Sequence, residues 1–221
     1  MRPLLAAVGV VIAFAPACGP STPTTASASP SRASAAASAP GDARFSPSDL
    51  PRILLRPDEA PDGTRADRSL AHPSDVDAFA HDVVERQALL NDGFESGYVV
   101  YFPPDSYFRK EPHKVTDVAF QAIAGLFDEA AGASSSLRRF VDDLRTRQMV
   151  GSATISGQGL GDEAFGLAGG AALDGSFVRV YAWRVSNVIL VLVASGPVAE
   201  DEALALARAM DERTGRVGPS G

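Results

Sequence analysis

The sequence holds few of the residues from which common active sites are built. Its 221 residues include one cysteine, one tryptophan and three histidines. A single cysteine, Cys18, excludes an internal disulfide and any metal site made of several thiolates. The histidines, His72, His81 and His113, lie far apart, and no two have the i, i+4 spacing of a helical zinc site. We therefore expect no metal and no cofactor, and interpret all three as surface or capping histidines.

Clustered positive charge is also missing. The formal net charge is −7, and Lys110 and Lys114 are the only lysines. This balance argues against a nucleic-acid partner and against electrostatic binding to anionic lipid, because both select a basic face. The apolar run at the N-terminus, residues 4–15, is shorter than the roughly 20 residues that a membrane-spanning helix needs.

Recognisable catalytic motifs are absent as well. No serine stands in a G-x-S-x-G elbow or an S-x-x-K motif. The glycine-rich stretch 157–161 lacks the third glycine of a dinucleotide fingerprint and precedes a strand pattern, so we expect a loop. Neighbouring carboxylates on a strand point to opposite faces, which places Asp162 and Glu163 poorly for shared acid–base chemistry and leaves a turn-capping role for Asp162. We expect no enzyme.

The N-terminus has the pattern of an export signal. Met1 and Arg2 precede the apolar run, and the small residues 15–17 (Ala-Pro-Ala) then satisfy the preference of a signal peptidase. The pattern predicts a signal peptide over residues 1–17 that is cut before Cys18.

The residues around Cys18 resemble a bacterial lipobox, in which small or aliphatic residues precede a cysteine that becomes residue one. The resemblance covers the first 18 residues. It implies a lipoprotein whose Cys18 carries diacylglycerol and palmitate, anchored at the extracytoplasmic face of the cell membrane. Two or three acyl chains, at about 0.8 kcal/mol per buried CH₂, would hold the protein there permanently. Simple secretion after the same cut is the alternative.

A disordered linker is expected between the cysteine and the folded part. Residues 19–40 are almost entirely Ser, Thr, Pro, Ala and Gly, with Arg32 as the only charged side chain. Such a tract cannot bury enough apolar surface to offset its ordering entropy. We assign residues 18–44 to the lipidated cysteine and a linker that spans roughly 25–30 Å. A glycosylated or recognition tract is the alternative.

Residues 45–215 are predicted to form a single α+β domain, and residues 216–221 a frayed tail. We expect a mainly antiparallel sheet of about 4–6 strands with helices packed on it. The expected helices are a short turn at 50–54, a helix from Ser74 to about Leu90, and helices at 133–147 and 198–213. The expected strands are 96–102, 115–127 with a bulge at Gly125 (helix being the alternative), 150–155 and 163–167.

The strongest pattern, in residues 176–195, predicts a hairpin that turns at Ser186-Asn187. One of its faces is large and aromatic, and the other is small and aliphatic. Its second strand is apolar on both faces, which predicts a central strand. We expect the narrow apolar stripe at 203–210 of the last helix to pack on the small-residue face. The expected pairs are Val185 with Val188, Trp183 with Leu190, Tyr181 with Leu192, Val180 with Val193, and Ala182 with Val191.

Three stretches carry a family resemblance: DLPRILLRPDEAPDGT, GLGDEAFGL, and WRVSNVILVLV followed by the terminal helix. Together they resemble uncharacterised secreted bacterial lipoproteins and are similar, more distantly, to extracellular sensor domains of PknH-type kinases and to PsbP-like α/β/α folds. The most recognisable point is Gly161-Asp162-Glu163-Ala164. The resemblance implies a binding or sensing module and identifies no functional residues.

The candidate binding rim is aromatic. The stretch 97–108 follows a strand into a Pro-Pro turn, which leaves some of its rings available to a ligand, and Trp183 is a further candidate, with a core position as the alternative. The candidate rim residues are Tyr98, Tyr101, Phe102, Tyr107, Phe108 and Trp183.

These observations favour an exported, membrane-anchored lipoprotein that acts as a ligand-binding or sensing module. The alternative is a structural or interaction lipoprotein of a cell-envelope assembly that binds no small molecule. A hydrolase with an unrecognised site is the third hypothesis. The partners expected are the membrane, through the lipid, and an unidentified protein or small molecule.

Overall fold

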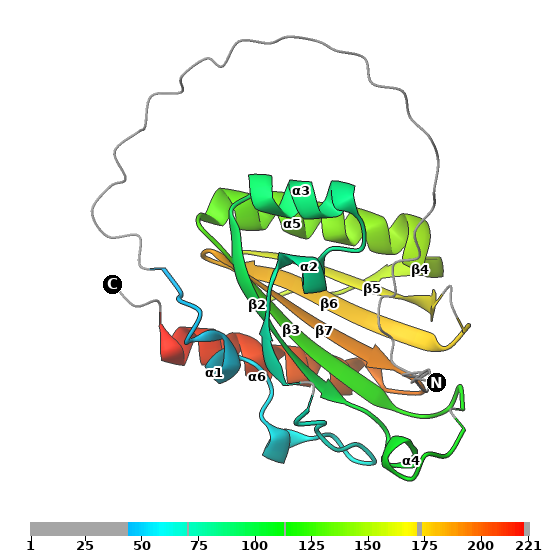
Figure 1. The fold of residues 1–221 in the computed structure, drawn as a ribbon. Helices are drawn as coiled ribbons and strands as arrows, with labels where there is room; N and C mark the ends of the chain where they lie inside the picture. The colour runs from blue at the N-terminus through cyan, green and yellow to red at the C-terminus, as the bar shows by residue number, and fades with distance from the viewer. Residues whose placement is uncertain (1–43, 70, 113, 172–173, 219–221) are drawn as a thin grey trace, which may run out of the picture.

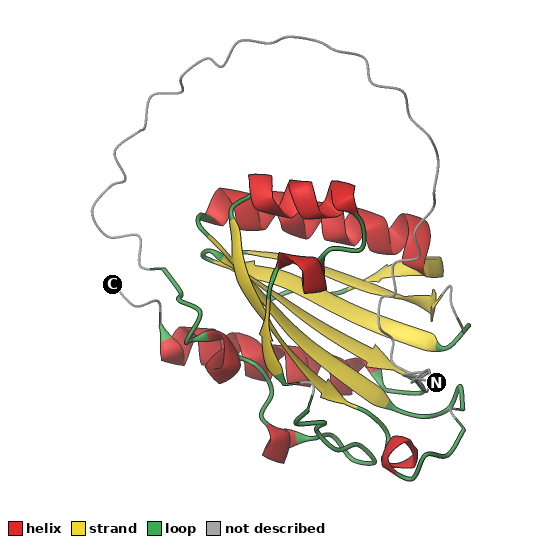
Figure 2. Ribbon diagram, in the orientation of Figure 1, coloured by secondary structure: helices red, strands yellow, loops and turns green. Residues whose placement is uncertain are grey.

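The structure is a computed structural model that describes residues 44–69, 71–112, 114–171 and 174–218. The expected signal peptide, Cys18 and nearly all of the expected linker lie outside these residues. The described chain forms one sheet with helices on both of its faces (Figures 1 and 2). This arrangement confirms the α+β class.

Seven strands of the described chain form one antiparallel sheet in the order β1-β2-β3-β7-β6-β5-β4. The expectation of about 4–6 strands was therefore too low. The missed strand, β1, has only three residues and contains Pro73, so it carries none of the usual strand signals; proline is tolerated there because β1 is an edge strand. The strands are β1 (His72–Ser74), β2 (Phe94–Phe102), β3 (Ala119–Phe127), β4 (Met149–Ile155), β5 (Glu163–Ala171), β6 (Phe177–Val185) and β7 (Val188–Ser195).

The helices divide between the two faces of the sheet. In Figure 1, α3 and α5 lie on one face, and α1 and α6 lie on the other. None of the helices in the described ranges is both long and apolar enough to cross a membrane. The α-helices are α1 (Leu50–Ile53), α2 (Val76–Phe79), α3 (Val83–Asn91), α4 (Asp105–Phe108), α5 (Ala130–Asp143), which continues into a π-helical turn (Leu144–Gln148), and α6 (Glu200–Val217).

The hairpin of β6 and β7 has the expected register, with all five predicted pairs present. Every residue of β7 is buried, which confirms a central strand covered on both faces. Its turn contains Ser186 in the left-handed region (φ 52°). The next residue, Asn187, is 3% exposed. Its side chain accepts a hydrogen bond from Phe45 N (2.9 Å) and donates to the carbonyl oxygens of Phe45 (3.3 Å) and Phe127 (2.8 Å).

The two faces of this hairpin are covered in the opposite way from the expectation. α6 packs on the aromatic face, where Ala203 and Ala207 share a buried cluster with Tyr181 and Trp183. The small aliphatic face is covered by α5 and its larger side chains, such as Leu137. The reason is volume, because small helix residues leave room for two bulky rings, whereas small strand residues need larger partners.

The single helix expected from Ser74 to Leu90 is two helices. Ser74 belongs to β1, and Asp75 caps α2 by accepting from Ala78 N (3.1 Å). After the break, Asp82 caps α3 by accepting from Glu85 N (2.8 Å). Each aspartate caps the start of a separate helix, so the segment forms two helices although its apolar spacing is that of one continuous helix. The break changes the direction of the chain over the sheet and places residues 79–85 above a cavity.

The segment that could have been strand or helix is a strand, β3, which confirms the preferred prediction although it begins at Ala119. Gly125 is not a bulge, since it pairs with Gly97 in regular register. The irregularity lies in β2, between Phe94 and Ser96. The two paired glycines leave the sheet surface without side chains at this point.

Candidate ligand-binding cavity

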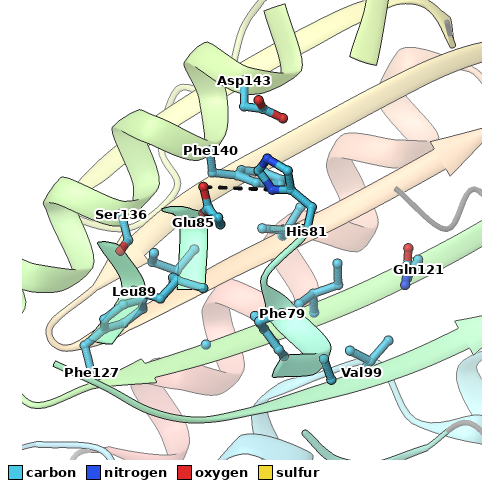
Figure 3. A pocket seen from close by; sticks show the side chains of 15 residues that line it. Phe79, His81, Glu85, Leu89, Val99, Gln121, Phe127, Ser136, Phe140 and Asp143 are labelled. Carbon is cyan, nitrogen blue, oxygen red and sulfur yellow. Dashed lines mark ion pairs between the residues drawn. The ribbon is translucent and has the colours of Figure 1, made fainter. Parts of the chain in front are cut away.

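A cavity of about 180 Å³ lies between one face of the sheet and the helices above it. Strands β2, β3 and β7 form its floor, and α2, α3 and α5 form its walls (Figure 3). A cavity of about 150 Å³ holds a benzene ring, so this volume suits a small organic molecule. The lining residues are Ala78, Phe79, His81, Glu85, Leu89, Val99, Gln121, Ile123, Gly125, Phe127, Ser136, Phe140, Asp143, Ile189 and Val191.

The paired glycines of the floor make space for rings. A β-carbon on Gly97 would lie 2.0 Å from the Phe79 ring, so that ring rests directly on the glycine. Phe79 in turn packs against Phe94, with 5.0 Å between ring centroids. A β-carbon on Gly125 would meet its nearest neighbour, the Phe127 ring, at an ordinary 3.5 Å. The floor is thus closely packed at Gly97 and open at Gly125.

The polar lining gathers on the helix side of the cavity. His81 has a side chain that is only 7% exposed, and its Nδ1 lies 3.9 Å from the Glu85 carboxylate. The other ring nitrogen lies 3.4 Å from Asp82 and 3.3 Å from Arg147. Since His81 lines a cavity, our interpretation of it as a surface or capping histidine was wrong.

Within this group, the Glu85 carboxylate has the weakest compensation by a nearby positive charge. The Glu85 side chain is 23% exposed, and His81 is the only basic residue of the described chain within 4 Å of its carboxylate. Burial raises the pKa of Glu85, and the positive groups of His81 and Arg139 offset that effect only in part. The Asp143 carboxylate, by contrast, pairs with Arg147 Nε at 2.9 Å and accepts from Gln148 Nε2 at 2.6 Å.

This pKa shift has a testable consequence for stability. A carboxyl whose pKa is raised by folding destabilises the fold above that pKa, and the penalty disappears as the pH falls toward the unfolded value of 4.5. Glu85→Gln should therefore raise the melting temperature at pH 7 by roughly 1–3 °C and leave it unchanged below about pH 4. Thermal melts across this pH range make the comparison.

Glu111 supplies a control of opposite sign, because its hydrogen bond with Arg109 lowers the pKa of its carboxyl. Glu111→Gln should give no stabilisation at pH 7. A Glu85→Gln protein that melts at or below the wild-type temperature at pH 7 would contradict the conclusion that the Glu85 charge destabilises the fold.

Gln121 contributes a second acceptor from the floor. It stands on β3, on the other side of the cavity from Glu85 (Figure 3). Its Oε1 atom is buried and has no hydrogen-bond partner. A buried carbonyl oxygen without a donor costs about 1–3 kcal/mol, so such an atom in a cavity indicates a missing donor.

Contacts between Asp92 and α5, which we call the Asp92 latch, hold α3 against α5. They fix the part of the cavity wall that these two helices form, which we call the roof. The carboxylate of Asp92 accepts hydrogen bonds from Ser136 Oγ (2.7 Å) and Arg139 Nη1 (2.5 Å), both on α5. Its backbone also approaches α5 closely, since a β-carbon on Gly132 would lie 1.9 Å from the Asp92 carbonyl oxygen. The Ser136 hydroxyl therefore donates its hydrogen bond to Asp92 and not to a group in the cavity.

The candidate aromatic rim lies elsewhere. Trp183 and Phe102 are completely buried in the core beneath α6, which corrects their assignment to a rim and supports the core alternative for Trp183. Tyr101 is 8% exposed and packs edge-on against Tyr107, with 6.3 Å between ring centroids. None of the six candidate residues lines the cavity.

Tyr98 and Phe108 have local partners. Tyr98 Oη donates to the Ala71 carbonyl oxygen at 3.3 Å. The Phe108 ring carries the guanidinium of Arg65 at 3.9 Å from its centroid. These contacts tie β2 and the 103–109 segment to the loop before β1.

Asp162 and Glu163 serve structural contacts on separate elements, as expected from their opposite directions. Asp162 accepts from Ser186 N and from Arg184 Nη1, each at 3.0 Å, and so caps the β6–β7 turn. Glu163 accepts from Ser134 (2.5 Å) and Arg138 (2.7 Å) of α5. Burial raises the pKa of Glu163, but these two hydrogen bonds together lower it below its usual range.

The cavity could not be predicted from the sequence, because its lining residues come from five separate stretches of the chain, within 78–89, at 99, and within 121–127, 136–143 and 189–191. The one local signal is the i, i+4 relation of His81 and Glu85, beside a helix break that the apolar spacing concealed. The residues that the structure describes contain no cluster of three or more His, Cys, Asp or Glu side chains able to hold a metal ion.

Comparisons with known proteins agree with the fold. No protein-family model and no curated protein sequence matches the chain. Among solved structures, the extracellular domain of PknH from Mycobacterium tuberculosis is similar, with a TM-score of 0.55 and 11% sequence identity. The match covers 80% of this chain and 100% of that one, and it shows a shared fold.

Proposed function

We propose that this protein is a ligand-binding or sensing module, that its binding site is the cavity beneath α3, and that it acts outside the cytoplasm without catalysis. The observation that carries the proposal is a small apolar cavity that contains Gln121 Oε1, a buried acceptor without a donor, and the Glu85 carboxylate, whose only basic neighbour of the described chain within 4 Å is His81, at 3.9 Å. Convergent polar groups in an apolar pocket are typical of ligand sites.

Two further observations support this function over the alternatives. The fold shared with the PknH extracellular domain supports an extracytoplasmic module. The one hydroxyl that lines the cavity, Ser136, is engaged by Asp92 and is poorly placed as a nucleophile, which disfavours a hydrolase. A purely structural protein would gain stability from filling such a cavity and from neutralising Glu85.

Binding of a neutral aromatic probe tests the cavity. Saturation-transfer NMR with toluene should show binding to the wild-type protein. Gly125→Leu should weaken it about tenfold or more, because the leucine side chain would occupy the space above Gly125 that the ligand needs, and overfilling the cavity costs about 1–3 kcal/mol. Gly170→Leu is the matched control, since Gly170 lies on β5 outside the cavity and its nearest neighbour to an added β-carbon is 3.8 Å away. Equal toluene binding by wild type and Gly125→Leu would argue for a structural or interaction lipoprotein instead.

We further propose that the module is held at the membrane by acyl chains on Cys18. The lipobox-like residues before this cysteine, and the linker-like tract after it, support the proposal. Cells fed a clickable palmitate analogue should label the wild-type protein and not the Cys18→Ser variant. Absence of label on the wild type, or equal label on both proteins, would favour simple secretion.

A further inference from the structure

The polar groups of the cavity define which ligand charge it accepts. The lining contains two carboxylates, Glu85 and Asp143, and no lysine or arginine; His81 is its only basic residue. Gln121 presents an acceptor oxygen that has no donor. A site of this composition repels an anionic ligand and offers hydrogen-bond acceptors that a ligand with donors can satisfy.

The arginines near the cavity already form ion pairs with other carboxylates. Arg139 Nη1 lies 2.5 Å from Asp92, and Arg147 Nε lies 2.9 Å from Asp143. Asp143 is therefore neutralised, and the Glu85 carboxylate is the one that lacks a cation at hydrogen-bond distance. Transfer of an unpaired charge into an apolar site is costly, and a charged partner from the ligand would remove that cost.

The apolar part of the cavity suits a ring. Phe79, Phe127 and Phe140 line it together with aliphatic side chains of the strands. Aromatic faces attract a cation as well as an apolar body. The cavity thus combines an apolar floor, aromatic walls and, at the side of α3, the Glu85 carboxylate, which has only the long 3.9 Å ion pair with His81 (Figure 3).

We propose that the cavity binds a small amphipathic amine, with an apolar body of about ten non-hydrogen atoms and a protonated nitrogen that pairs with Glu85. This inference rests on the proposed function, and it specifies the ligand class of the same site. Gln121 Oε1 accepts a second donor from the ligand. Anionic ligands of the same size are repelled by the Glu85 carboxylate.

Amine binding must then depend on pH. The titratable and charged groups that face Glu85 are His81 and Asp82 at the α2–α3 junction, and Arg139 and Asp143 on α5. As the pH falls, protonation of Glu85 removes the attraction for the amine. This change weakens amine binding in acid and should not affect a neutral ligand of the same shape.

Three probes of nearly equal size test the ligand class: 2-phenylethylamine, 2-phenylethanol and phenylacetate. In calorimetric titrations at pH 7, the amine should bind about tenfold or more tightly than phenylacetate. Glu85→Gln should weaken amine binding about ten- to hundredfold and change 2-phenylethanol binding less than about twofold. Glu111→Gln, whose carboxyl lies outside the cavity, should leave all three affinities unchanged.

The outcomes separate this inference from the proposed function. Phenylacetate binding as tightly as the amine, or an amine affinity that Glu85→Gln leaves unchanged, would overturn the amine class while 2-phenylethanol binding still supports the cavity. Failure of all three probes, together with failure of toluene, would overturn both. Because Glu85→Gln is expected to stabilise the fold, loss of amine binding in that variant cannot be attributed to unfolding, and a melt of the same sample verifies this.

Discussion

Replacing Gly132 by alanine is expected to lower the free energy of unfolding by about 2–4 kcal/mol, although alanine is the better helix former. The added β-carbon would lie 1.9 Å from the Asp92 carbonyl oxygen, and this neighbour is backbone that cannot rotate away. α3 and α5 must therefore separate, and the Asp92 latch to Ser136 and Arg139 must lengthen. Chemical denaturation of the two proteins measures the loss.

Gly215 provides the matched control. It also lies within a helix, α6, but a β-carbon there would meet nothing within 4 Å. Gly215→Ala should therefore raise the free energy of unfolding by about 0.5–1 kcal/mol, the ordinary gain in helix propensity. A change of stability in the same direction for both alanine variants would contradict the close packing of α3 against α5. It would equally contradict the roof of the cavity that these helices form.

Asn187→Ala is the second substitution with a large expected effect, a loss of about 3 kcal/mol. The variant leaves Phe45 N and the carbonyl oxygens of Phe45 and Phe127 without a partner in a buried position. Each unsatisfied buried group costs about 1–3 kcal/mol, and partial relaxation keeps the sum below the maximum. Hydrogen exchange should also show the segment around Phe45 opening at lower energy, because Asn187 connects it to the hairpin.

Asn91, the chain's only other asparagine, is the control. Its side chain is exposed at the end of α3 and accepts one hydrogen bond, from Gln87. Asn91→Ala should stay within about 0.5 kcal/mol of the wild type. A similar loss for both variants would show that the buried network around Asn187 contributes little.

The hairpin shows what the sequence predicts well. Alternation along 176–195 fixes its register, and the two-sided apolar pattern of β7 identifies the centre of the sheet. The role of Asn187 could not be predicted, because its partners Phe45 and Phe127 lie 142 and 60 residues away. Local turn preferences alone would have favoured Asn-Gly at this turn.

The cavity shows where prediction from one sequence ends. The apolar spacing of 76–90 predicts one helix, and two capping aspartates break it at the position that brings His81 and Glu85 above the sheet. Gln121 was part of a predicted strand, but its orphan oxygen depends on the roof formed by α3 and α5. The aromatic composition of residues 97–108 predicted a binding rim, whereas most of these rings are buried or pack against one another.

The most direct test of the central claim locates a bound amine by NMR on protein with labelled Ile, Leu and Val methyl groups. With 2-phenylethylamine, we expect NOEs from the ring protons to the methyls of Ile123, Ile189 and Val191, which line the cavity. Methyls on the opposite face of β7, such as Leu190 and Leu192 beneath α6, should show none. NOEs to Leu190 and Leu192, or to the exposed Val83 and Val84 alone, would contradict the cavity as the binding site.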